Sequence, residues 1–124
     1  MKVEFPGLVD IQVNGFGGVD FNSPDVSVDD VHRALLVIRA TGVTRFLPTF
    51  ITGPLERFAH CARVILEAGD PSIAGIHLEG PYISPTDGPR GAHPLAHTQA
   101  ASADDFRRRQ GAAERQPERK PVWP

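Results

Sequence analysis

Apolar residues follow two different periods along this chain. Residues 8–13, 43–47 and 73–78 form short apolar runs of strand length, each bounded by Gly or Pro. Residues 28–41 and 54–68 instead place an apolar side chain at every third or fourth position, as one face of a helix does. The pattern therefore predicts the order strand, helix, strand, helix, strand.

This order determines how the strands are expected to pair. Strands that are joined by a helix lie parallel in one sheet, with right-handed connections. We expect the second strand to stop at Pro48, which cannot donate to a ladder. Asn14, Thr49 and Glu79 lie at or just after the three strand ends. Ligands of parallel α/β folds lie beyond the carboxyl ends of the strands, so these residues should share one edge.

The third predicted strand ends in His-Leu-Glu, residues 77–79. Alternate strand residues point to opposite faces, so His77 and Glu79 share one face and their apolar neighbours take the other. An ionised carboxylate is costly to bury alone, so we expect a metal, another cation or a functional cleft beside Glu79. The structural alternative is a salt bridge with Arg45 or Arg90.

Length and composition limit the classes of protein that this chain can represent. Its 124 residues suit one ordinary domain and are too few for most α/β barrels. A formal net charge of −2 gives no broad basic field, so we expect no nucleic-acid partner. The one cysteine, Cys61, lies on an apolar helix face and favours a cytoplasmic location. We find neither a signal peptide nor a membrane-spanning run and expect no membrane partner.

The regular pattern fades after the third strand. Residues 84–94 have the composition of a long loop, and a weak helix is predicted from 102 to 109. The triplet Arg107–Arg109 is interpreted as a solvated face. We therefore divide the chain into a barrel segment, residues 1–106, and a tail, residues 107–124, which is expected to be disordered.

Three motifs, taken in order, resemble one known enzyme family. They are PGLVDIQVNGFGG at 6–18, TGVTRFLPT at 41–49, and HLEGPYISP at 77–85 with GAHP at 91–94. These stretches are similar to the first three barrel strands, and to the loop after the third, of the N-acetylglucosamine-6-phosphate deacetylases. Each motif alone would be only suggestive, but their order and spacing make the resemblance specific.

The resemblance implies a fold and a reaction. The fold would be α/β, a partial TIM barrel with about the first three of eight parallel strands, as in the amidohydrolase superfamily. The reaction would hydrolyse N-acetylglucosamine 6-phosphate to glucosamine 6-phosphate and acetate, a step of amino sugar catabolism. The implied cofactor is a divalent metal cation, zinc or similar, which lowers the pKa of bound water and polarises the amide carbonyl.

The resemblance also implies roles for individual residues. Glu79 matches the metal-ligand glutamate of the family, and Ala92 and His93 match positions that contact the sugar substrate. The other metal ligands and the catalytic aspartate of the family lie on later strands. We therefore assign no catalytic residue here and expect the metal site to be incomplete in this chain.

Three further polar residues are expected at the mouth of the barrel. Gln12 and Asn14 occupy the positions at which relatives with two metals carry a His-x-His pair. In this family, the resemblance implies, the replacement of that pair goes with loss of one metal position. His77 is expected to have a structural or supporting role at the same mouth rather than to be a ligand.

These assignments leave several outcomes open. The chain is expected to be inactive alone and to be a truncated or frame-shifted product of a deacetylase gene. It could instead be a non-catalytic fragment that binds a sugar phosphate or pairs with a complementary fragment, or part of another amidohydrolase. The expected ligand is a small amino sugar phosphate, and the full-length family is expected to form homo-oligomers.

Overall fold

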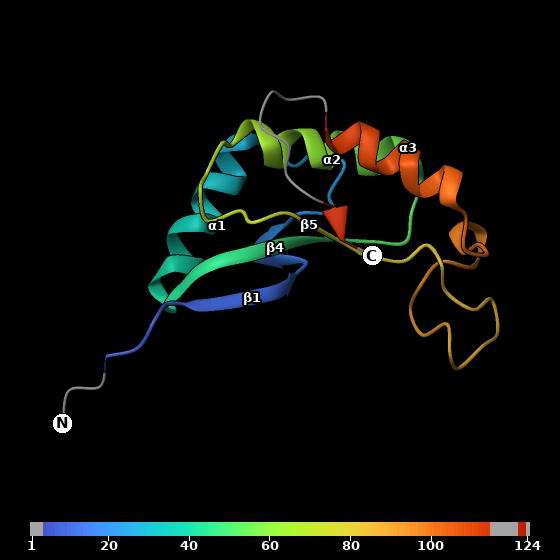
Figure 1. Cartoon of the computed structure of the whole chain (residues 1–124), viewed down its shortest axis with the longest axis horizontal. Coiled ribbons are helices and arrows are strands. Elements are labelled where there is room, and N and C mark those ends of the chain that lie inside the picture. Colours follow the sequence, from blue (N-terminus) through green and yellow to red (C-terminus); the bar gives the residue numbers. More distant parts are fainter. Residues whose placement is uncertain (1–3, 115–121, 124) are drawn as a thin grey trace.

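A parallel sheet lies at the centre of the computed structural model, which describes residues 4–114 and 122–123. Its strands follow the spatial order β1-β4-β5-β6, and neighbouring strands run parallel (Figure 1). They span Leu8–Val13 (β1), Val43–Ile51 (β4), Ile76–Glu79 (β5) and Val122–Trp123 (β6). The predicted parallel pairing of the first three strands is confirmed, and the protein is of the mixed α/β class.

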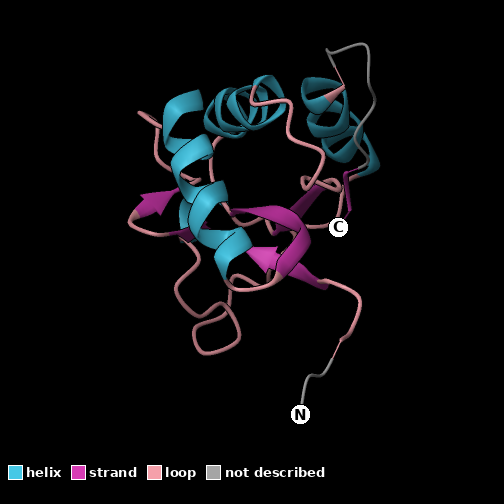
Figure 2. Ribbon diagram, turned by 90° about the vertical axis from the view of Figure 1, so that its left-hand side faces the viewer, coloured by secondary structure: helices cyan, strands magenta, loops and turns pink. Residues whose placement is uncertain are grey.

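The α-helices of the described residues lie on one side of this sheet (Figures 1 and 2). They span Val28–Ala40 (α1), Leu55–Glu67 (α2) and Ala103–Ala113 (α3), and a 3-10 turn covers Leu95–His97. The Ser27 hydroxyl accepts from the Asp30 N–H, and the Asp30 carboxylate accepts from the Ser27 N–H, which completes a capping box. Within the described residues, no helix is long and apolar enough to cross a membrane.

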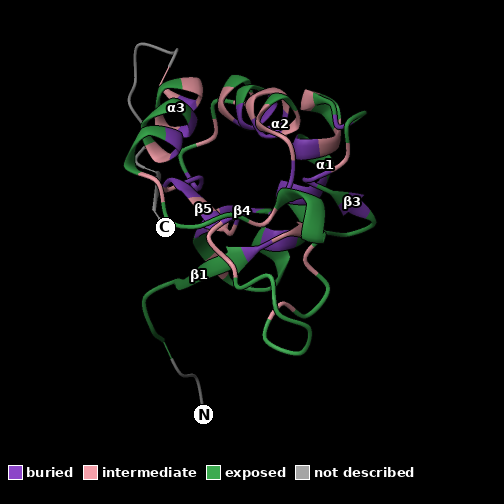
Figure 3. Cartoon of the chain, turned by 90° about the vertical axis from the view of Figure 1, so that its right-hand side faces the viewer, coloured by how far each residue is buried: buried purple, intermediate pink, exposed green. Residues whose placement is uncertain are grey.

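The apolar core fills the layer between the helices and the sheet. Ile76 and Leu78 of β5 point into this layer and are 0% and 5% exposed. Strand β1 differs, because the side chains of Val9 and Ile11 are 63% and 67% exposed (Figure 3). The alternation of β5 therefore produces a buried apolar face and a polar face, whereas the apolar face of β1 remains largely exposed.

A short hairpin follows β1 that the apolar pattern did not reveal. Strands β2 (Gly15–Phe16) and β3 (Val19–Asp20) pair antiparallel. The two residues between them, Gly17 and Gly18, have φ angles of 60° and 82°, a combination that favours glycine in a two-residue hairpin turn. The glycine-rich stretch therefore forms a tight turn.

The prediction that Pro48 ends the second strand was wrong. Strand β4 continues to Ile51, and Pro48 lies inside it opposite Val13. The Val13 N–H donates to the Thr49 hydroxyl at 3.0 Å, so a side chain accepts this bond where the ladder register shifts. The missing N–H of Pro48 is therefore tolerated within a parallel pair. The third strand begins later than predicted, at Ile76.

Helix α3 runs past the boundary that the sequence placed at residue 106. Its buried residues include Asp105 and Arg109, whose carboxylate Oδ2 and guanidinium Nε are 2.8 Å apart. The Arg109 guanidinium also lies over the Phe58 ring of α2, 5.7 Å from its centroid. The expectation that residues 107–113 belong to a disordered tail, and that Arg109 is solvated, was therefore wrong. Residues 115–121 and 124 of that tail lie outside the described residues.

The same carboxylate ties α3 to the chain segment that leaves β5. The Tyr82 hydroxyl donates to Asp105 Oδ2 at 3.1 Å. Burial alone would raise the pKa of Asp105, but the hydrogen bond and positive charge of Arg109 outweigh it, and the pKa lies below its ordinary value. Burial and the neighbouring carboxylate raise the pKa of the Tyr82 phenol. Asp105 is therefore held in its charged form by two donors.

Removing the buried cation should destabilise the fold. Arg109→Ala is expected to lower the free energy of unfolding by about 3 kcal/mol, because the Asp105 carboxylate would stay buried without its partner. Because the folded-state pKa of Asp105 is lowered, this contribution is fully present above its unfolded value, near 3.8, and is lost as the pH falls through the folded value. Urea unfolding followed by circular dichroism at pH 7 measures the change.

Arg107→Ala on the same helix is the matched control. Arg107 pairs with Asp104 at 3.0 Å, and both side chains are largely exposed. This variant should lose less than about 1 kcal/mol. Equal losses in the two variants would contradict the assigned importance of the buried pair.

Candidate functional site

Glu79 is the last residue of β5 and lies on the polar face of that strand. Ile76 and Leu78 turn towards the helices, so His77 and Glu79 point to the opposite face of the sheet. Both side chains are partly exposed. The predicted sharing of one face by the histidine and the carboxylate is therefore confirmed.

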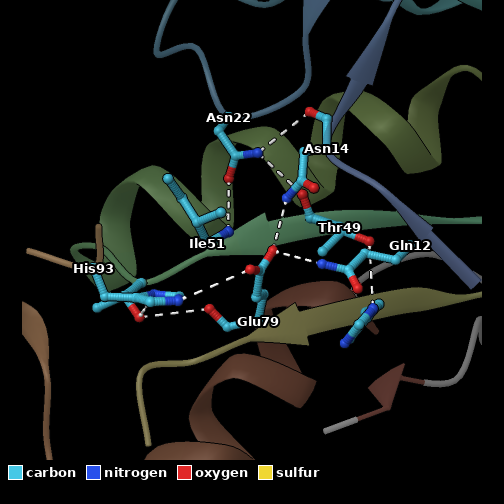
Figure 4. A network of polar contacts seen from close by, with 9 residues as sticks. Gln12, Asn14, Asn22, Thr49, Ile51, Glu79 and His93 are labelled. Carbon is cyan, nitrogen blue, oxygen red and sulfur yellow. Dashed lines mark hydrogen bonds and ion pairs between the residues drawn. The ribbon is translucent and has the colours of Figure 1, made fainter. Parts of the chain in front are cut away.

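Two amide side chains from the other end of the sequence hold this carboxylate. Gln12 Nε2 and Asn14 Nδ2 each donate to Glu79 Oε2 at 3.0 Å (Figure 4). Glu79 Oε1 lies 3.9 Å from His93 Nε2. One oxygen of the carboxylate is thus occupied by two neutral donors, while the other faces the histidine.

The structural alternative for Glu79, a salt bridge with Arg45 or Arg90, does not describe this arrangement. The Arg90 guanidinium pairs with the Asp87 carboxylate and donates from Nη1 to the His93 carbonyl at 2.9 Å. The hydrogen bonds to the Glu79 carboxylate come from neutral side-chain amides and not from an arginine. Within the part of the chain that the structure describes, no guanidinium therefore pairs with the Glu79 carboxylate.

A pocket of about 310 Å3 lies beside this carboxylate. Its lining includes Glu79, Ala92 and His93, together with Ile51 and Arg90. The structure thus places the predicted metal ligand and the two predicted substrate contacts around one hollow. Gln12 and Asn14 are not among the lining residues; their side-chain amides donate to Oε2 of the Glu79 carboxylate.

His77 lies on the same polar face but contacts other groups. Its Nδ1 is 2.9 Å from the Ile11 carbonyl and 3.4 Å from the Thr49 hydroxyl. A carbonyl oxygen only accepts, so Nδ1 of His77 carries a proton. This bond joins β5 to β1 across β4, which agrees with the supporting role predicted for His77.

Sequence analysis missed Asn22, which is 9% exposed and binds backbone groups at the end of β4. Its Nδ2 donates to the Thr49 carbonyl at 3.0 Å, and its Oδ1 accepts from the Ile51 N–H at 2.8 Å (Figure 4). Asn22 therefore satisfies backbone groups of β4 next to the site. No periodicity marks it; the only sequence signal is an asparagine two residues after the hairpin.

Gly80 is required where the chain leaves β5. Its φ angle is +95°, and a Cβ atom there would lie 2.0 Å from the Thr52 hydroxyl oxygen. A side chain at this position would therefore both strain the backbone and displace Thr52. The glycine of the Glu-Gly-Pro motif lets the chain turn directly after the carboxylate.

The residues present supply only part of a metal site. Glu79 Oε1 is one ligand, whereas a catalytic zinc takes three protein ligands and keeps a position for water. Among residues 4–114 and 122–123, no group of three His, Cys, Asp or Glu side chains could hold a metal ion. A complete centre would need ligands beyond the described residues, and we derive no metal-dependent step from them.

Comparison with known proteins agrees with this geometry. No protein-family model matches the chain. It is 41% identical over 106 residues to the N-acetylglucosamine-6-phosphate deacetylase of Bos taurus, a match that covers 82% of this chain and 25% of that protein. It is 40% identical over 94 residues to the N-acetylgalactosamine-6-phosphate deacetylase of Shewanella sp. (strain ANA-3), covering 73% of this chain and 23% of the relative.

The folds agree as well. The crystal structure of N-acetylglucosamine-6-phosphate deacetylase from Pasteurella multocida matches with a TM-score of 0.73 and 33% identity, over 87% of this chain and 28% of that one. The chain belongs to the N-acetylglucosamine-6-phosphate deacetylase family. It spans about a quarter of the length of the curated deacetylases it matches. The resemblance seen in the motifs is therefore confirmed, and the family is one of hydrolytic enzymes.

Replacing an amide donor of this site by a carboxylate should be costly. Asn14→Asp removes one bond to Glu79 and puts a like charge beside it, so we expect a loss of about 1–3 kcal/mol in the free energy of unfolding at pH 7. Urea unfolding measures the loss. In a Glu79→Gln background the same substitution should cost much less, because the repulsion is gone. An equal cost in both backgrounds would contradict the contact between Asn14 and Glu79.

Proposed function

We propose that this chain is part of an enzyme that hydrolyses the N-acetyl group of N-acetylglucosamine 6-phosphate to give glucosamine 6-phosphate and acetate. The single observation that carries the proposal is that the Glu79 carboxylate and His93 lie 3.9 Å apart and line the same pocket. It is supported by relatives named as amino-sugar-phosphate deacetylases. The reaction would belong to amino sugar catabolism.

In this proposal the pocket residues receive the sugar. His93 and Ala92 would contact the substrate, since both line the hollow next to Glu79. Glu79 would contribute one ligand, through Oε1, to a divalent cation such as zinc. Gln12 and Asn14 would hold the carboxylate at Oε2, so that its other oxygen stays directed at the pocket.

The fold supports a wider architecture in the full-length enzyme. A sheet of four parallel strands, with the α-helices of the described residues on one side, is the arrangement expected from part of a TIM barrel. The polar face carrying Glu79 would then line the barrel interior. A cytoplasmic location and a homo-oligomeric full-length enzyme stay predictions.

A second candidate substrate is the epimer N-acetylgalactosamine 6-phosphate. The observation that favours it is the 40% identity to a deacetylase named for that sugar, nearly equal to the identity with the Bos taurus protein. The two sugars differ in the orientation of one hydroxyl group. Both should therefore be compared in the same binding experiment.

Binding of the sugar is the first test. N-acetylglucosamine 6-phosphate is expected to shift the backbone amide signals of residues 91–93 in an NMR titration, because these residues line the pocket. His93→Gln should raise Kd by about tenfold, the loss of one good hydrogen bond. His97→Gln is the matched control, since His97 is exposed on the following 3-10 turn and should leave Kd unchanged.

Acetate release is followed in the same samples with zinc added. The described residues supply too few ligands for a metal centre, so no turnover is expected from this chain alone. Metal-dependent turnover that Glu79→Gln abolishes would overturn the expected inactivity. Absence of any sugar-induced shift at residues 91–93 would overturn the proposed substrate site.

A further inference from the structure

Thr52 lies beneath the pocket, directly after β4. It is 1% exposed, and its Oγ1 is 2.9 Å from His93 Nδ1. The same oxygen is 3.5 Å from the Glu79 carbonyl. A single buried hydroxyl therefore touches both the pocket histidine and the strand end that carries the carboxylate.

The distances show which contact of the hydroxyl is a full hydrogen bond. A hydroxyl donates one proton, and a 3.5 Å oxygen–oxygen distance is longer than an ordinary O–H···O bond. The 2.9 Å contact with Nδ1 of His93 has the length of a full hydrogen bond. In this contact Nδ1 either accepts the Thr52 proton or donates its own to Oγ1, and the surroundings of the other ring nitrogen decide between the two.

The charge on the far side of the ring favours the arrangement in which Nδ1 accepts the Thr52 proton. Nε2 of His93 faces Glu79 Oε1 at 3.9 Å. A lone pair on Nε2 would face a carboxylate and be repelled, whereas an N–H there is attracted. Thr52 on one side and Glu79 on the other thus favour a neutral ring that carries its proton on Nε2.

We propose that Thr52 is a positioning residue that holds His93 as the Nε2–H tautomer and directs this N–H into the pocket. The pocket then offers a hydrogen-bond donor, which suits an oxygen acceptor such as a sugar hydroxyl, an acetyl carbonyl or a phosphate oxygen. The tautomer is a property of the free chain; only its use in binding the sugar phosphate rests on the proposed function.

Thr52 acts on the ring, and a different residue holds the backbone of His93. Arg90 Nη1 donates to the His93 carbonyl at 2.9 Å, which fixes the loop but does not select a ring tautomer. Gly80 leaves room for the Thr52 hydroxyl, because a Cβ there would lie 2.0 Å from it. The role of Thr52 can therefore be tested separately from the anchoring of the loop.

His77 provides an internal reference for the test. Its Nδ1 donates to the Ile11 carbonyl at 2.9 Å, so the proton of the neutral ring is on Nδ1. The two histidines should therefore show opposite tautomers in one spectrum. Long-range 1H–15N correlation of the 15N-labelled chain distinguishes protonated from bare ring nitrogens, and His93→Gln and His77→Gln assign the signals.

The experiment is recorded about two pH units above the ordinary histidine pKa of about 6.5, where imidazole rings are neutral. We expect Nε2–H at His93 in the native chain and in Thr52→Ser, which keeps the hydroxyl. In Thr52→Val, the 15N chemical shift of His93 Nδ1 should change to the value of an unprotonated ring nitrogen that accepts no hydrogen bond. An Nδ1–H tautomer in the native chain, or an unchanged Nδ1 signal in a natively folded Thr52→Val, would overturn the proposal.

Sugar binding completes the test. Thr52→Val is expected to weaken binding of N-acetylglucosamine 6-phosphate about fivefold, the loss of one ordering hydrogen bond, while Thr52→Ser binds as the native chain does. Equal affinities for native and Thr52→Val would overturn the positioning role.

If the tautomer is as stated and the native chain binds no sugar, the proposed function fails and the tautomer assignment stands. If Thr52→Val does not fold, the native and Thr52→Ser spectra still decide the tautomer.

Discussion

The hydrogen bonds to Glu79 Oε2 are the interaction on which the site depends. They join β5 to residues of the first strand region, 65 and 67 positions earlier in the sequence. Both donors are neutral amides, so they orient the carboxylate without cancelling its charge. An arginine in their place would form a paired ion and reduce the attraction for a cation. The second oxygen, Oε1, is thereby left to face His93 and the pocket.

This arrangement follows from the way the sheet is packed. Ile76 and Leu78 are buried under the helices, and alternation then places His77 and Glu79 on the other face. Parallel pairing brings the ends of β1, β4 and β5 to one edge, where Gln12 and Asn14 reach the carboxylate. Apolar burial on one face thus determines the polar chemistry on the other.

The sequence was most informative where burial follows a regular period. It predicted α1, α2 and the polar face of β5 because each has an apolar side that recurs at helix or strand spacing. It predicted most of α3, as a weak helix from 102 to 109, but missed the buried ion pair between Asp105 and Arg109, because a hydrophobic pattern assigns charged residues to the surface. It also stopped β4 at Pro48, because the Thr49 side chain that accepts the Val13 N–H cannot be inferred from strand propensity.

Within the site, types of residue were easier to predict than contacts. Glu79, Ala92 and His93 were found through a strand-end carboxylate and a family motif, and the structure places them around one pocket. Asn22 and Thr52 were missed, because their importance comes from single hydrogen bonds to residues distant in the sequence. Such contacts depend on tertiary structure and leave no periodic signal. Membership of the deacetylase family adds the chemical context in which these contacts are interpreted.

The side-chain amide signals of Gln12 and Asn14 give the most direct test of the central interaction. Their NH2 groups are recorded in 1H–15N spectra of the native chain and of Glu79→Ala. If the two amides hold Glu79 Oε2, both signals will move and exchange faster with solvent in the variant, while the amide of a distant residue such as Gln110 stays unchanged. Unchanged signals for both Gln12 and Asn14 would contradict the account.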